Sequence, residues 1–169
     1  YNIAPQDGTA FGVVPPEFLF RQMFGDKNAR FDASKFNWIG NPLGSGIVVV
    51  VLDSAPVKNW REAKETVVLM GGSGPSAPDT VVANLSNGTL GTKFKIVIGY
   101  PAGQDIVLAM ERGEVQGRAA QSWAGWIATN PDWVANKRIV PLFQVAMKPV
   151  PELLDIPLLI DIVEGSEAK

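Results

Sequence analysis

The sequence predicts an α/β fold with a mostly parallel sheet flanked by helices. From residue 67 onward, short apolar runs rich in β-branched residues alternate with segments of helical periodicity, and glycine-rich turns separate them. Strands that alternate with helices are joined by right-handed crossovers, which generate parallel strands. Hydrophobic residues make up 46% of the 169 positions, enough for a real core.

The first part of the chain contains the less regular elements. The unbroken apolar run IVVVVL at 47–52 predicts a strand buried on both faces. Asn59 precedes Glu62 by three positions, which is the spacing of a capping box at a helix start. We expect extended segments at 9–14, 36–40 and 47–52, and helices at 17–25 and 60–65.

The second part repeats strand, turn and helix. In the helix expected at 104–112, an apolar stripe faces the core and Gly113 ends the helix. Pro131 suits the first turn of a helix within a broken helical connection at 122–137. The remaining expected elements are strands at 67–70, 94–98, 115–119 and 139–145 and a helix at 79–90.

Composition excludes several function classes. There are 15 Lys and Arg against 17 Asp and Glu, so no basic field exists to attract nucleic acid. Without Cys or His, the chain lacks thiol nucleophiles, imidazole relays and thiolate zinc ligands. We therefore expect no catalytic residues, no metal and no cofactor. The longest apolar run is far shorter than a bilayer span requires.

Two glycine-rich turns are the strongest candidates for a ligand site. GGSGPSAPDT at 71–80 and GYPAGQD at 99–105 each follow a strand and open a helix. In a doubly wound sheet, ligands bind at the carboxyl ends of the strands, where the amides of a helix start favour an anion. The spacing Gly72, Gly74, Ala77 also matches a dinucleotide fingerprint, G-x-G-x-x-A.

The dinucleotide interpretation lacks its second part. A ribose-binding acid should end the following strand, yet no carboxylate appears before Asp105. No Lys-Ser or Lys-Thr follows the glycines, which excludes a P-loop. The alternative is purely structural: Ser76, three residues before Asp79, would cap the next helix, and Asp79 would compete with an anion for the helix end.

Three further side chains have open alternatives. Tyr100, Trp123 and Trp126 fit core packing better than ligand stacking, although Trp123 follows a strand end and could line a cleft. Arg118 lies in a predicted strand, where burial would demand a carboxylate partner, whereas a strand-end position would make it a carboxylate clamp. Periodicity does not decide between these roles.

The order of segments resembles a known family. It is similar to the order in the extracytoplasmic solute receptors of the tripartite tricarboxylate transporter system, the Bug or TctC-like family. The segments that carry the resemblance are, in chain order, DGTAFGVV, ARFDASKFNWIGN, VKNWREAKE, VVLMGGSGPSAPDT, NGTLGTKFKIVIGYPAGQDIVLAMERGEVQGR and PELLDIPLLID. The resemblance spans nearly the whole chain. It implies one lobe of a type II periplasmic-binding-protein-like fold, which in the family is two lobes closing on a small organic acid.

The resemblance also implies ligand-binding positions, with Pro75, Pro78 and Asp79 departing from the small, hydroxyl-rich turn of the family. Carried over onto this sequence, the positions are Gly71, Gly72, Ser73, Gly74, Ser76, Tyr100, Pro101, Gly103, Ser122 and Trp123.

Family members are about twice as long, so the resemblance implies a central fragment. Residues 1–30 would be a remnant of the first lobe, 31–150 the second lobe, and 151–169 a return segment toward the missing part. The strand at 9–14, without its sheet, should be disordered or paired with another copy, giving an edge-paired or strand-exchanged homo-oligomer.

The function expected from the resemblance is capture of a carboxylate-bearing organic acid in the bacterial periplasm, for membrane transporter subunits, with no nucleic-acid partner. Three alternatives stay open: a nucleotide-dependent oxidoreductase domain, a carboxylate-based hydrolase, and a non-catalytic interaction domain that uses a solvent-facing tryptophan-rich stretch at 123–133.

Overall fold

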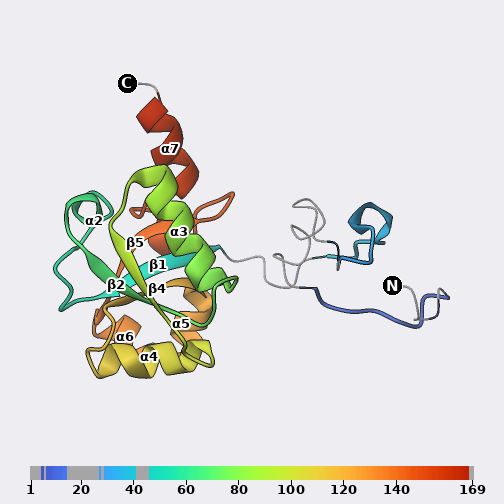
Figure 1. The fold of residues 1–169 in the computed structure, drawn as a ribbon, viewed down its shortest axis with the longest axis horizontal. Coiled ribbons are helices and arrows are strands. Elements are labelled where there is room, and N and C mark those ends of the chain that lie inside the picture. Colours follow the sequence, from blue (N-terminus) through green and yellow to red (C-terminus); the bar gives the residue numbers. More distant parts are fainter. Residues whose placement is uncertain (1–4, 6, 15–26, 28, 41–45, 168–169) are drawn as a thin grey trace. The chain divides into compact units, whose positions relative to one another are not determined.

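The computed structural model describes residues 5, 7–14, 27, 29–40 and 46–167. The chain divides into two compact units, Tyr1–Pro42 and Leu43–Lys169, and each is treated by itself (Figure 1). Within the described part, no helix is both long enough and apolar enough to span a bilayer.

The first unit contains one short described element, the 3-10 helix η1 (Ala33–Lys35), which Asp32 caps by accepting the Ser34 N–H at 3.1 Å. The strand predicted at 9–14 is wrong: these residues are in no strand, and Phe11 is 88% exposed. A strand needs a neighbour that supplies ladder hydrogen bonds, and no described segment does so here. Residues 36–40 also form no strand, and the helix expected at 17–25 lies outside the described residues.

The second unit is built on a five-stranded mixed sheet in the order β3-β2-β4-β1-β5. β2 pairs in parallel with β3 and β4, whereas β1 pairs antiparallel with β4 and β5. β1 is thus the one strand of this sheet that runs against the others, and the α/β fold class is confirmed. The strands are β1 (Ile47–Leu52), β2 (Val68–Gly72), β3 (Phe94–Ile98), β4 (Gly117–Ser122) and β5 (Ile139–Val145).

Helices cover both faces of the sheet, which buries β1 on both sides as its unbroken apolar run predicts. α3 and α7 lie on one face with α2, and α4, α5 and α6 lie on the other (Figure 1). The helical elements are α2 (Glu62–Glu65), α3 (Pro78–Leu90), α4 (Gly103–Glu111), α5 (Trp123–Thr129), α6 (Pro131–Ala135), η2 (Pro151–Leu153) and α7 (Leu159–Glu167).

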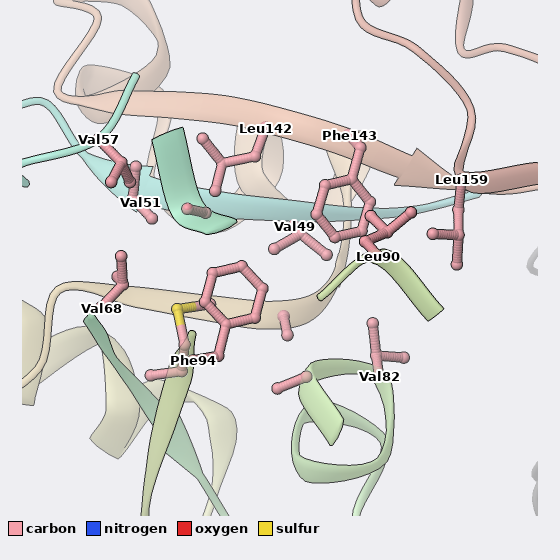
Figure 2. Packing of buried hydrophobic residues seen from close by; sticks show 14 of the residues in the cluster. Val49, Val51, Val57, Val68, Val82, Leu90, Phe94, Leu142, Phe143 and Leu159 are labelled. Atoms are coloured by element: carbon pink, nitrogen blue, oxygen red, sulfur yellow. The ribbon is translucent and has the colours of Figure 1, made fainter. Parts of the chain in front are cut away.

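The face under α3 carries the first hydrophobic cluster. Val49 and Phe143 of the sheet meet Val82 of α3 and Leu159 of α7 (Figure 2). Removing surface of this kind from water contributes about 25 cal/mol per Å². This cluster packs α3 against the sheet and thereby fixes the position of the turn between β2 and α3.

The opposite face carries the second cluster. Its α4 part is the predicted stripe of Ile106, Val107, Ala109 and Met110, all buried, while Glu111 and Arg112 are exposed as expected. Gly113 adopts φ +74° just after the C-cap of α4, a conformation that glycine takes without strain. Trp126 and Trp133 stack with ring centroids 6.2 Å apart, and Pro131 occupies the first turn of α6.

The cap of α2 is close to the prediction. Asn59 Oδ1 accepts the Arg61 and Glu62 N–H groups at 3.0 and 3.1 Å. Glu62 reaches back to the Lys58 N–H at 2.6 Å rather than to that of Asn59, so the box is shifted by one residue. The helix itself begins at Glu62, two residues later than expected.

The segment after β5 is tied to the second unit by one buried side chain. Gln144 Nε2 donates to the Leu153 and Ile156 carbonyls at 2.9 and 2.7 Å, and its Oε1 accepts the Val150 N–H at 2.8 Å. These bonds satisfy the amide of a fully buried glutamine. A role of residues 151–169 as a return segment to another lobe stays a prediction.

Candidate functional site

The topology places the switch point of the sheet between β2 and β4. These neighbouring strands run in parallel, yet β2 continues into α3 on one face and β4 continues into α5 on the other. Ligands of open α/β sheets bind at such a point, beyond the carboxyl ends of the strands. Both glycine-rich turns meet there, because the Gly99 and Tyr100 N–H groups donate to the Gly72 carbonyl at 3.1 and 3.4 Å.

The turn after β2 is filled by a carboxylate of the chain itself. Asp79 is 4% exposed and accepts the Ser73 N–H at 3.2 Å, the Ser73 hydroxyl at 3.1 Å and the Thr80 N–H at 2.9 Å. A carboxylate in the first turn of a helix complements the positive end of the dipole. Asp79 therefore places a carboxylate at this helix start, and its competition with an anionic ligand stays a prediction.

The predicted capping role of Ser76 is wrong. Pro78 is the first residue of α3, so the N-cap is Ala77, whose side chain makes no capping bond, and Ser76 is exposed. Proline fixes the backbone angle φ at the first helical position, which sets the helix start there. The turn is closed through Ser73 and Asp79 instead.

The glycines of this turn serve different purposes. Gly71 and Gly72 belong to β2 and are buried; an added Cβ would overlap Ile106 of α4 at Gly71 and Thr80 of α3 at Gly72. Both therefore permit close packing of a helix on the sheet. Gly74 is different, because an added Cβ would meet nothing within 4 Å.

The turn after β3 combines packing and polar contacts. The Tyr100 hydroxyl donates to Glu114 Oε2 at 3.3 Å, and the Tyr100 ring packs against the second cluster. Burial, followed by the Glu114 charge, raises the pKa of Tyr100. Pro101 is exposed. At the start of α4, Asp105 Oδ2 accepts the Ala102 N–H at 2.9 Å.

Arg118 of β4 lies against this second turn. It pairs with Gly71 in the sheet register, and an added Cβ on Gly103 would overlap the Arg118 guanidinium. Arg118 Nη1 donates to Gln121 Oε1, whereas Nε is buried with no hydrogen-bond partner. Burial lowers the pKa of Arg118, and the nearby Asp79 charge opposes this shift.

The charge of Arg118 is incompletely balanced. Among the ion pairs of the described residues, none involves Arg118. Asp79 acts on it at longer range while its carboxylate oxygens are engaged by Ser73 and Thr80. The side chain is partly buried, and the carboxylate partner expected for a buried arginine is not found among the ion pairs of the described residues. The role of Arg118 as a carboxylate clamp stays a prediction.

Ser122 and Trp123 belong to the start of α5 and to the second cluster. Ser122 Oγ accepts the Gly125 N–H at 3.0 Å and caps α5. Trp123 is 8% exposed within the second cluster, with Trp126 and Trp133 also buried. The solvent-facing tryptophan surface expected at 123–133 is therefore wrong, because all three indoles turn inward to fill the space between α5, α6 and the sheet.

A cavity lies outside these predicted positions, beside the start of β1 and the end of β5. It is lined by Gly46, Ala124 and the segment from Lys148 to Glu152. No cluster of acidic side chains able to hold a metal ion occurs in the described part of the chain.

The sequence analysis assigned ligand binding mainly to the residues of the glycine-rich turns. It did not predict that Arg118 lacks an ion-pair partner, and the position of Arg118 in a predicted strand was the available signal.

No protein-family model and no curated protein matches the sequence. Solved structures do match. The R. palustris protein Rpa4515, solved with adipate, is 19% identical, with a TM-score of 0.57 over 72% of this chain and 41% of that one. MatC from Rhodopseudomonas palustris, with bound malate, is 15% identical, with a TM-score of 0.57 over 72% and 42%. A TctC solute binding protein from Polaromonas, without ligand, is 16% identical, with a TM-score of 0.56 over 69% and 40%.

The chain spans about two fifths of the length of these proteins. The periplasmic binding protein BugD matches as well, with a TM-score of 0.52. The resemblance to Bug and TctC-like receptors is thus confirmed at the level of the fold, as is the α/β lobe that it implies. Over 69% and 70% of its length, respectively, the chain has the mixed α/β fold of part of the TctC solute binding protein and of BugD.

Proposed function

We propose that this chain is part of a periplasmic receptor that captures a small carboxylate-bearing organic acid for a membrane transporter. The observation that carries the proposal is the fold shared with Rpa4515 and MatC, whose structures hold adipate and malate. Both ligands are dicarboxylates. The net charge of -2 and the absence of Cys and His fit a binding protein better than an enzyme.

Binding of this kind requires no chemistry. In the complete receptor, two lobes close around the acid by a hinge motion, and polar groups of both lobes together with bridging waters neutralise its carboxylates. The closed form then docks on the membrane subunits of the transporter. This chain would contribute the groups at the carboxyl edge of β2, β3 and β4.

The oxidoreductase alternative is less well supported. A dinucleotide would need the amides of the turn from Gly72 to Ala77 for its pyrophosphate, yet Asp79 engages the Ser73 N–H and hydroxyl. A fixed negative charge at that position repels a phosphate. No observation favours the hydrolase alternative.

A thermal-shift screen of the chain against adipate, malate and NAD tests the proposal. We expect small, concentration-dependent stabilisation by the organic acids in the millimolar range and none by NAD, because stabilisation by a ligand grows with the logarithm of its concentration relative to the dissociation constant. Isothermal calorimetry should detect no dicarboxylate binding of micromolar affinity, since an isolated lobe offers only part of the contacts. Stabilisation by NAD alone would contradict the proposal.

A further inference from the structure

We propose that the guanidinium of Arg118, rather than the glycine turn from Gly72 to Ser76, is the anion-receiving group of this unit and contacts a carboxylate of the ligand directly. That the anion is an organic acid rests on the proposed function. The existence of an anion site at Arg118 rests on the structure of the second unit alone.

The first step concerns the glycine turn, which already contains its anion. Asp79 accepts three hydrogen bonds there, from the Ser73 N–H, the Ser73 hydroxyl and the Thr80 N–H. A second carboxylate would have to displace a buried one or lie beside it, and like charges at such a distance repel. The turn is therefore a poor receiver for an anionic ligand.

The second step concerns the unsatisfied guanidinium. Arg118 has five N–H donors in a planar fork, yet its hydrogen bond in the described structure goes to Gln121, a neutral partner. Its Nε is buried without a partner, and the ion pairs of the described residues do not include it. A partly buried cation normally has a hydrogen-bonded counterion, so the missing group is a carboxylate or a similar anion.

The third step concerns position. Arg118 of β4 pairs with Gly71, which is one residue before the carboxyl end of β2. The side chain therefore lies at the switch point of the sheet, between β2 and β4. Gly103 at the start of α4 has no side chain, and this lets the guanidinium lie against the helix start. The side chain is partly exposed, so that solvent and a ligand can reach it. A guanidinium in this position can bind a carboxylate through two parallel hydrogen bonds.

The test is an NMR titration of the ¹⁵N-labelled chain with malate, adipate and sulfate, observing backbone amides and arginine Nε–Hε groups. We expect the Arg118 Nε–Hε and Gly103 N–H resonances to move saturably with malate or adipate. Arg118→Met should weaken this binding by about tenfold or more, as expected for loss of a charged hydrogen bond. Arg118→Lys should weaken it less, because the charge remains while the planar fork is lost.

The matched control is Arg112→Met, which removes an exposed arginine at the C-cap of α4 and should leave the titration unchanged. Thermal unfolding supplies a second readout. If Arg118 serves a ligand, Arg118→Met should keep or raise the melting temperature, because it removes an unpaired, partly buried charge. A clear fall in melting temperature would make Arg118 a structural residue and overturn the proposal.

The outcomes separate this inference from the proposed function. Saturable shifts at Ser73 and Gly74 that persist in Arg118→Met, with the Arg118 resonance unmoved, would overturn the role of Arg118 and leave the receptor intact. Equal responses of Arg118 to sulfate and to both acids would support the anion site and contradict the organic-acid receptor. No saturable response of the Arg118 resonance to any of the three anions would overturn the inference.

Discussion

The turns after β2 and β3 lie at the same edge of the sheet, but they differ in the charge that lies beside them. The turn after β2 binds its own carboxylate, Asp79, through Ser73. The turn after β3 instead packs its first helical glycine, Gly103, against Arg118, whose charge has no ion-pair partner among the described residues. Glycine content alone therefore does not identify which turn binds an anionic ligand.

The contrast has a simple electrostatic basis. A helix start offers a partial positive charge, which an anion from the chain itself or from a ligand can neutralise. Asp79 occupies this place in α3. The start of α4 also has an acid, Asp105, but the adjacent Arg118 adds a full positive charge. The predictions below begin with the largest expected effect.

Removing the internal anion should break the contrast. Asp79→Ala leaves the Ser73 and Thr80 donors without an acceptor, and we expect the free energy of unfolding to fall by about 3 kcal/mol. Urea denaturation measures this change. Asp79→Asn, which keeps one acceptor oxygen, should lose less. A loss as small in Asp79→Ala as in an exposed control such as Asp132→Ala would show that the turn does not depend on its carboxylate.

Gly71 near the end of β2 and Gly74 in the turn that follows offer a matched pair of variants. An added methyl at Gly71 overlaps Ile106, so Gly71→Ala should lower the free energy of unfolding by about 2 kcal/mol. Gly74→Ala meets open space and should change it by no more than about 0.5 kcal/mol. Both values come from the same denaturation series. Equal losses would mean that Gly71 is not a packing glycine.

Gly103→Ala should act on Arg118 with little effect on stability. The added methyl overlaps the end of a flexible side chain, which can move, so we expect a change within about 0.5 kcal/mol in the free energy of unfolding. The Nε–Hε resonance of Arg118 should shift in the variant without ligand. An unmoved Arg118 resonance would contradict the close approach of the guanidinium to the start of α4.

The smallest effect concerns pH. Burial and the Glu114 charge raise the pKa of Tyr100, so Tyr100 should ionise at higher pH than an ordinary tyrosine. Because the folded-state pKa lies above the unfolded one, this contribution to stability is complete at neutral pH and is lost as alkaline pH rises through the folded value. Ultraviolet titration of the chain and of Tyr100→Phe separates the two phenols. Glu114→Gln should bring the transition of Tyr100 to lower pH.

Much of the fold was predictable because its signals are local. The strands β3 and β5 occur at the predicted residues, and the apolar stripe of α4 is buried as expected. The prediction of a strand at 9–14 was wrong. The apolar pattern of this segment is that of a strand, but strand formation also depends on a partner strand elsewhere in a chain. Trp123 and Trp126 were rightly favoured as core residues.

The sequence by itself determined the fold class, the order of most elements of the second unit and the excluded chemistries, because periodicity, turn residues and the lack of Cys and His can be read along the chain. Only the tertiary structure decided which turn is occupied. Asp79 meets Ser73 across a turn, and Arg118 meets Gly103 between a strand and a helix start. Whether a buried charge has a partner depends on distances between segments, and those distances exist only once the sheet and its helices have packed.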